Sequence, residues 1–268
     1  MSARRGNGAP PVALAGRGLS KAYRLGELHS LRRTFEGLRG RTNGTSTASL
    51  EVLTGVDFTV YRGESFGIVG TNGSGKSTML QIIAGTTLPT GGEMEVHGRV
   101  VPLLAVGTGF HPELTGQENV RLFAASLGIP LDVIEQRIGA VAAFAELERH
   151  METPVKRFSS GMLSRLSFSI AMQVPADIYI FDEVLAVVDG EFQRRCLQEI
   201  KRLHGAGRTV IFVSHSLDQV QEVCERVMWL ERGRIEQVGP AGEVLASYGR
   251  AHGSSAAAPD SDDVGSSG

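Results

Sequence analysis

Two patterns of apolar residues alternate along the chain: short continuous runs, and residues at helical spacing. Short apolar runs bounded by turn residues predict buried strands at 65–69, 178–181 and 209–213. Apolar residues at helical spacing follow two of the turn-rich loops and predict helices at 79–84 and 193–203. Strands separated by helices indicate an α/β fold with a mostly parallel central sheet and helices on both faces.

The end of the chain differs from this alternation. Residues 227–235 flank a turn at Glu231, Arg232 and Gly233, which predicts a peripheral antiparallel β element. Two terminal segments are rich in small and polar residues and contain too little apolar surface to offset the entropy cost of ordering. We therefore predict one folded domain at 12–248 between two disordered tails, at 1–11 and 249–268.

Composition narrows the class of protein. The chain has 268 residues, of which 41% are hydrophobic and 21% are charged, as in a globular protein with a sizeable core. A formal net charge of -2 gives no general attraction to polyanions, so we expect no nucleic-acid partner. No run approaches the roughly 20 apolar residues of a membrane-spanning helix. Cys196 and Cys224 lack metal-ligand spacing and are expected to be reduced core residues.

A phosphate-binding loop is predicted between the first strand and the first helix. Residues 70–78 read GTNGSGKST and match the pattern G-x-x-x-x-G-K-[ST]. Glycines let backbone N–H groups approach phosphate oxygens, and the helix N-terminus adds about half a positive charge. Lys76 would contact the β- and γ-phosphates, and the Ser77 hydroxyl would hold Mg²⁺. The residues predicted to bind ATP are Gly70, Thr71, Asn72, Gly73, Ser74, Gly75, Lys76, Ser77 and Thr78.

Two adjacent acids follow the predicted strand at 178–181. Asp182 would orient Mg²⁺ through water, and Glu183 would polarise the attacking water as general base. An isolated acidic pair at the end of a strand is more often a solvated strand end. The phosphate loop upstream favours the catalytic interpretation here.

A Ser/Gly motif precedes the acidic strand, in the sequence VKRFSSGMLSRL. Ser159, Ser160, Gly161 and Met162 resemble the signature motif of the ABC (ATP-binding cassette) family, in the form common among polysaccharide exporters. The resemblance implies a P-loop NTPase fold in which a helical subdomain carries this motif. It also implies that the motif contacts the ATP bound to a second copy of the chain. The same residues suit an N-cap for a helix at 162–172, and both roles can hold at once.

Three further residues match the family pattern. Asp189 resembles the D-loop aspartate, and His215 resembles the H-loop histidine that contacts the γ-phosphate and the attacking water. A lone histidine after a strand is usually a structural cap, so the catalytic role rests on the other motifs. Tyr23 matches the aromatic residue that stacks on adenine, although a tyrosine in a strand more often packs than stacks.

The resemblance covers residues 12–248 and extends to one functional group of cassettes. The segment 107–120, GTGFHPELTGQENV, is similar to subunits that export O-antigen, teichoic acid and cell-wall galactan. Val106 stands where ordinary cassettes carry a glutamine, and Gln117 comes too late to replace it. Contact between this loop and Mg²⁺ is therefore left unassigned.

The resemblance implies a peripheral subunit at the cytoplasmic face of the cell membrane. It would hydrolyse ATP for a separate integral membrane permease that moves a lipid-linked polysaccharide, and the sequence leaves the identity of the polymer open. One alternative is an ABC ATPase of a different transporter or a soluble ABC ATPase of translation or DNA maintenance. Another is a silent regulatory cassette, which would be expected to lack Glu183 or His215.

An insertion at 24–49 makes the chain longer than a cassette needs between Tyr23 and Leu50. Its apolar residues recur at helical spacing and its arginines occupy the remaining faces, which predicts a short basic amphipathic helix. This helix would pack on its own domain, or contact the permease or anionic lipid headgroups. The residues concerned are Leu28, Leu31, Phe35 and Leu38 on the apolar stripe, and Arg32, Arg33 and Arg39 around it.

Overall fold

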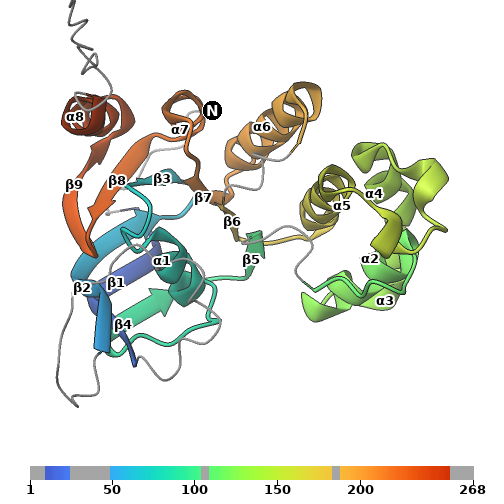
Figure 1. The fold of residues 1–268 in the computed structure, drawn as a ribbon, viewed down its shortest axis with the longest axis horizontal. Helices are drawn as coiled ribbons and strands as arrows, with labels where there is room; N and C mark the ends of the chain where they lie inside the picture. Colours follow the sequence, from blue (N-terminus) through green and yellow to red (C-terminus); the bar gives the residue numbers. More distant parts are fainter. Residues whose placement is uncertain (1–9, 25–48, 104–108, 183–187, 254–268) are drawn as a thin grey trace, which may run out of the picture.

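The computed structural model of the chain describes residues 10–24, 49–103, 109–182 and 188–253. Figure 1 shows two β-sheets beside a lobe of helices. Three of the predictions concern residues outside these ranges. The general base Glu183, the loop at Val106 and the helix of the insertion all lie outside the described residues.

The central sheet has six strands in the order β5-β6-β7-β3-β8-β9. Neighbouring strands from β5 to β8 are parallel, and β9 is antiparallel to β8 at the edge. The three predicted strands and the predicted hairpin all lie in this sheet. The hairpin turns at Arg232 and Gly233, whose φ values of 48° and 76° suit a two-residue turn. The strands are β3 (Ser65–Val69), β5 (Val100–Leu103), β6 (Ile178–Asp182), β7 (Thr209–Val213), β8 (Arg226–Glu231) and β9 (Arg234–Pro240).

A second sheet has three antiparallel strands in the order β2-β1-β4. They are β1 (Val12–Arg24), β2 (Ser49–Tyr61) and β4 (Gly91–Val96). The sequence analysis did not predict this sheet. The pairing of β1 with β2 shifts register at several points, among them between Gly16 and Leu19. Each irregularity interrupts the alternation of apolar and polar residues, so the period of two is weak in the sequence.

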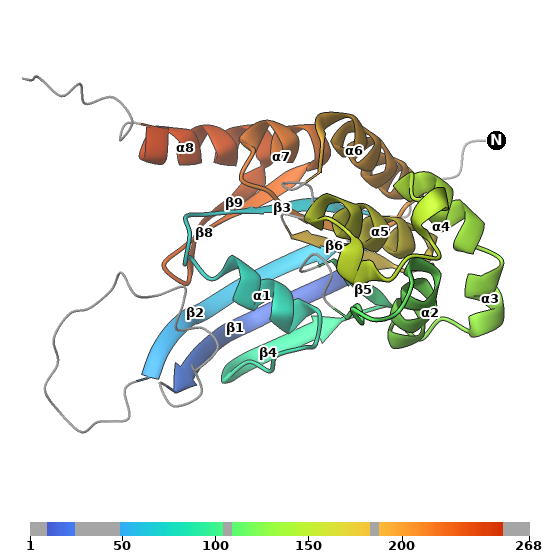
Figure 2. The same cartoon turned by 45° about the vertical axis from the view of Figure 1, so that its right-hand side comes forward.

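Helices cover both faces of the central sheet, as Figure 2 shows. One face packs against α1 (Lys76–Ile83) and the three-stranded sheet, and the other packs against α6 (Gly190–Gly205), α7 (Leu217–Val223) and α8 (Ala241–Gly253). Strand β6 illustrates the division. Its residues Ile178 and Ile180 belong to the first core and Tyr179 and Phe181 to the second. The predicted α/β fold with helices on both faces is confirmed.

A helical lobe projects from the parallel sheet (Figure 1). Helices α4 and α5 pack together in it through the stacked rings of Phe144 and Phe168, whose centres are 5.9 Å apart. The described residues contain no helix with both the length and the apolar character needed to cross a bilayer. The lobe consists of α2 (Gly116–Ser126), α3 (Leu131–Glu135), α4 (Ile138–Ala145), α5 (Ser160–Gln173) and two short 3-10 turns at Glu148–His150 and Val155–Arg157.

The C-terminal helix α8 is longer than predicted. A disordered tail was expected from residue 249, whereas the helix continues through Gly253. Its last turn is anchored by aromatic contacts: the His252 ring lies 4.5 Å from the Tyr248 ring and 5.7 Å from the Trp229 ring. The contact with Trp229, on the distant strand β8, stabilises a segment whose own composition predicts disorder.

Candidate functional site

The predicted motifs follow strands that end at the same edge of the central sheet. Strand β7 lies between β6 and β3, and all three are parallel. The chain leaves β3 into Gly70, ends β6 at Asp182 in register with Val213, and leaves β7 into Ser214. Polar and glycine residues from three separated segments therefore meet at the carboxyl edge, where α/β sheets bind ligands.

Glycines of the 70–78 loop occupy positions without room for a side chain. A Cβ atom at Gly70 would lie 2.0 Å from the Leu230 carbonyl oxygen, and one at Gly75 would lie 2.9 Å from the Val52 carbonyl oxygen. Gly75 also has a φ of 109°, a left-handed value that other residues rarely adopt. The loop is thus held between the two sheets, and it leads directly into the start of α1.

The start of α1 combines a helix N-terminus with a positive charge. No side chain among the described residues caps its first turn, and that turn contains no acid. Lys76 is only 8% exposed, and its ammonium group donates hydrogen bonds to the Gly70 oxygen (2.7 Å) and the Thr71 oxygen (3.0 Å). The charge is therefore folded back over the loop, in the arrangement that suits an anion at a helix N-terminus.

The other residues of the loop differ in exposure. Asn72, Gly73 and Ser77 are exposed, and Thr78 is half-buried. Ser74 is buried, and its carbonyl oxygen accepts a hydrogen bond from the Gly233 N–H at 2.9 Å. The Ser77 hydroxyl is thus accessible at the first turn of α1, as a cation ligand would need to be.

Glu231 supports the loop from the β8–β9 hairpin, and the sequence analysis did not assign it a role. The Thr71 hydroxyl donates a hydrogen bond of 2.6 Å to the Glu231 carboxylate across 160 residues of sequence. In the sequence, Glu231 is an acidic residue at the end of a predicted strand, next to the turn. Acidic residues are common at such positions, so the sequence alone does not predict the contact with Thr71.

His215 and the start of the phosphate loop line one cavity. Its volume is about 280 Å³. The loop that carries His215 is braced by Ser214, whose hydroxyl donates to the Gln219 side chain at 2.8 Å and accepts from the Ser216 N–H at 3.1 Å. The lining residues are Val69, Gly70, Ser214, His215, Leu217, Tyr248, Gly249 and His252. The structure therefore brings the predicted H-loop to the predicted phosphate loop.

The predicted signature residues lie at the start of α5 in the helical lobe. Ser159 is the N-cap, and its hydroxyl accepts a hydrogen bond of 3.2 Å from the Met162 N–H. The predicted capping role is confirmed. Ser159 and Ser160 are exposed. Among the described residues, none of 159–162 lines the cavity at His215.

Asp189 connects the signature helix to α6. Its carboxylate accepts a hydrogen bond of 3.0 Å from the Phe192 N–H, as N-cap of α6, and pairs with Arg165 of α5. These two interactions lower the pKa of Asp189 from 3.8 to about 2. Arg165 also pairs with Glu146 of the lobe. The sequence analysis did not single out Arg165, because a basic residue on a helix is usually solvated.

Tyr23 lies near the end of β1, opposite Leu50 of β2, and is half-buried. The Lys21 ammonium group lies 4.8 Å from the centre of the tyrosine ring and donates a hydrogen bond of 2.8 Å to the Leu88 oxygen. The ring thus makes one cation–π contact within the chain. The position of Tyr23 is compatible both with packing inside the chain and with stacking on adenine.

The GFHPELTG segment owes its shape to one buried side chain that the sequence analysis missed. Asn119 is fully buried, and its amide group donates to the oxygens of His111, Leu114 and Thr115 at 3.0–3.1 Å while accepting from the His111 N–H at 2.7 Å. Thr115 and Glu118 form a capping box at the start of α2. The described part of this segment is therefore rigidly folded.

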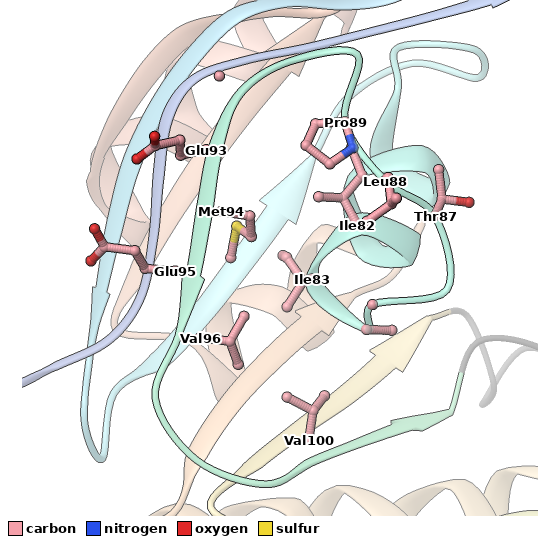
Figure 3. Close-up of a pocket in the computed structure, with 13 residues that line it drawn as sticks. Ile82, Ile83, Thr87, Leu88, Pro89, Glu93, Met94, Glu95, Val96 and Val100 are labelled. Carbon is pink, nitrogen blue, oxygen red and sulfur yellow. The ribbon is translucent and has the colours of Figure 1, made fainter.

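A second hollow, of about 610 Å³, lies between the end of α1 and β4. Figure 3 shows Met94 and Val96 of β4 on the side that faces α1, with Glu93 and Glu95 pointing away. No residue of the predicted ATP site lines this hollow within the described chain. Its mostly apolar lining does not suit a phosphate group, so the motif residues identify the candidate site better than cavity size does.

Comparisons with known proteins agree with these motifs. A family model described as "ABC transporter" matches residues 53–186. The chain is 41% identical to the O-antigen export system ATP-binding protein RfbB of Klebsiella pneumoniae, over 82% of this chain and 87% of the relative. It is also 41% identical to the teichoic acids export ATP-binding protein TagH of Enterococcus faecalis, over 73% of this chain but only 44% of that longer relative.

Solved structures give the same fold. One is a dimer of an ATP-binding cassette in a post-hydrolysis state, bound to ADP and Pi. It superposes with a TM-score of 0.69 at 22% identity, covering 85% of this chain and 98% of that chain. At this identity the likeness supports the fold alone.

Proposed function

The chain belongs to the ABC transporter family of ATP-hydrolysing subunits, and we propose that it drives the export of a lipid-linked cell-surface polysaccharide through a separate permease. The observation that carries this proposal is the match to the O-antigen export subunit of Klebsiella pneumoniae across most of both chains. The teichoic acid relative supports the same substrate class. The chain itself does not distinguish O-antigen, teichoic acid and galactan.

The nucleotide site is assigned to the 70–78 loop and its neighbours. Backbone donors at the start of α1 and the Lys76 ammonium group, which lies against the Gly70 oxygen of the same loop, would bind the phosphates, because both carry positive charge. Tyr23 would stack on the adenine. Ser77 and Asp182 would hold Mg²⁺, which neutralises phosphate charge when bound. The accessible Ser77 hydroxyl and the position of Asp182 at the end of β6 fit that ion.

Hydrolysis is assigned to residues at the same edge of the sheet. Glu183 follows Asp182 directly and would take a proton from the attacking water as general base. His215 would contact the γ-phosphate, since it lines a cavity together with Gly70. The presence of both residues in the chain argues against a silent regulatory cassette.

The signature residues are assigned to the ATP of a second copy. Ser159 and Ser160 are exposed at the N-terminus of α5 and do not line the cavity at His215 among the described residues. A helix N-terminus that is exposed in one subunit can contact phosphate in another. Asp189 would accompany the motif, because Arg165 joins it to α5. We therefore propose a homodimer with two ATP molecules between its subunits, bound peripherally to the permease at the cytoplasmic face.

Depletion of the protein in its own cells tests the export assignment. We expect undecorated lipid-linked polymer to accumulate on the cytoplasmic face of the membrane, and a Lys76→Ala copy should fail to restore export. A detergent extract should yield a membrane permease together with the tagged chain. Normal surface polysaccharide in depleted cells, with loss of uptake of a small nutrient, would refute the export assignment and leave the ATPase assignment intact. Recovery with ribosomes or DNA would favour the soluble alternative.

A further inference from the structure

The carboxylate of Glu231 joins three parts of the chain. One oxygen accepts the hydrogen bond of 2.6 Å from the Thr71 hydroxyl in the phosphate loop. The other accepts a hydrogen bond of 3.3 Å from the Trp229 indole and lies 3.4 Å from Nε2 of His252 in α8. The glutamate side chain is 19% exposed, so these contacts are partly shielded from solvent. What distinguishes Glu231 is that its partners come from the phosphate loop, from β8 and from α8.

Thr71 connects Glu231 to Lys76, because its side chain contacts the glutamate and its backbone oxygen contacts the lysine. Its backbone oxygen accepts a hydrogen bond of 3.0 Å from the Lys76 ammonium group and one of 3.2 Å from the Ser74 N–H. Anchoring the Thr71 side chain therefore restricts the peptide that binds the ammonium group. The same hairpin contacts the loop a second time, through the Gly233 N–H and the Ser74 oxygen.

The C-terminal helix restricts the carboxylate from the other side. Tyr248 and His252 of α8 pack edge-on against the Trp229 ring, with ring centres 5.5 and 5.7 Å apart. Burial alone would raise the pKa of Glu231, but the hydrogen bonds from Thr71 and Trp229 and the nearby His252 lower it below its usual range. The carboxylate is thus kept in its ionised form, which is the stronger acceptor.

We infer that Glu231 is a positioning residue for ATP binding, which acts through Thr71 and is itself oriented by Trp229 and the end of α8. A preorganised loop binds phosphate without first paying the entropy of ordering. Loss of Glu231 should therefore weaken ATP binding and leave the chemical step nearly unchanged. The inference rests on the proposal that the 70–78 loop binds ATP.

Steady-state kinetics of the full chain with MgATP test this inference. Glu231→Ala should raise KM and the Kd of a fluorescent ATP analogue about tenfold, the scale of one hydrogen bond to a charged group, with kcat changed less than about twofold. Glu231→Gln retains an acceptor oxygen for Thr71 and should have a smaller effect. Glu236 lies on the same hairpin and is exposed, so Glu236→Ala is the matched control and should leave KM unchanged.

A double-mutant cycle tests the route through Thr71. Thr71→Val removes the hydroxyl at nearly constant volume, and Glu231→Ala should raise KM little further in that background. Trp229→Phe keeps the ring but removes the indole N–H, and should raise KM about two- to threefold.

Three outcomes would overturn the inference. The first is independent, multiplicative effects of the Thr71 and Glu231 changes on KM. The second is a Glu231→Ala protein with a lower Tm but an unchanged KM, which would make the residue purely structural. The third is a fall in kcat without a rise in KM. A Lys76→Ala control separates the two proposals: if that change does not weaken ATP binding, the site assignment itself is wrong.

Discussion

Glu183 and Lys76 are predicted to affect different steps. Glu183→Gln preserves the shape of the side chain and removes the base, so ATP hydrolysis should fall by roughly 10²- to 10⁴-fold. ATP binding should survive. Because hydrolysis would reopen the ATP-bound dimer, this variant should accumulate as an ATP-dependent dimer in size-exclusion chromatography. Turnover close to that of the unmodified chain would show that another carboxylate is the base.

Lys76→Ala should give the opposite pattern. Removal of the ammonium group weakens phosphate binding and transition-state stabilisation together, so ATP affinity, turnover and the ATP-dependent dimer should all be lost. Lys201 is the matched control, because this residue of α6 forms a half-exposed ion pair with Glu222 of α7. Lys201→Ala should retain ATP binding, since surface pairs contribute about 0–1 kcal/mol. A dimer formed by Lys76→Ala in ATP would contradict the assignment.

The pH dependence of stability should reveal the interactions of Asp189. Its folded pKa, lowered from 3.8 to about 2, lies below the unfolded value. The charged form therefore stabilises the fold fully above about pH 4 to 5, and this contribution is lost as pH falls through the folded pKa. In urea unfolding, the stability difference between the unmodified chain and Asp189→Asn should stay constant from pH 7 to 5 and shrink only below about pH 4. A difference that shrinks already between pH 6 and 5 would contradict the lowered pKa.

At the scale of elements, α5 has one serine for its cap and another for the proposed contact with ATP. Ser159→Ala removes the capping oxygen for the Met162 N–H and should cost about 1 kcal/mol of unfolding free energy. Ser160→Ala leaves that cap intact, so it should retain the unfolding free energy but weaken the ATP-dependent dimer. Chemical unfolding and size-exclusion chromatography with ATP distinguish the two variants. Equal losses of unfolding free energy in the two variants would mean that Ser159 and Ser160 both contribute to the cap.

The helical lobe is also joined to the rest of the chain at defined points. Arg165 pairs with Glu146 in the lobe and with Asp189 at the start of α6, and its guanidinium group lies 4.8 Å from the centre of the Phe192 ring. Two ion pairs and a ring contact therefore converge on one side chain. This convergence joins the start of α6, at Asp189, to α5, the helix that begins at the proposed signature residues.

At the scale of the whole molecule, the C-terminal helix should contribute to stability as far as its last turn. Deletion of 249–268 removes His252 and its ring contacts with Tyr248 and Trp229. Aromatic contacts of about 0.5–1.5 kcal/mol each should lower Tm by about 2–6 °C in a domain of this size. Deletion of 254–268 is the matched control and should leave Tm unchanged in a thermal melt. Equal melting temperatures for the two truncations would contradict the role of the last turn.

The sequence alone predicted a candidate site where chemistry depends on consecutive residues. The phosphate-loop pattern at 70–78, the acidic pair Asp182 and Glu183 and the Ser159 cap are short patterns, and each requires its residue types at fixed spacing. Of the three, the structure confirms the cap. The buried parallel strands were predictable for a related reason: a strand covered on both faces is apolar throughout. Family membership and the α/β fold followed from these local features together.

Only the tertiary structure decided contacts between distant segments. Register shifts between β1 and β2 concealed the antiparallel sheet, and α8 continues through Gly253 because Trp229 lies beside it. Thr71 and Glu231 are ordinary residues in their own surroundings, and they become a pair only when β8 lies next to β3. Such contacts depend on how whole elements pack, and packing free energy is shared among many residues, so no local pattern in the chain encodes them.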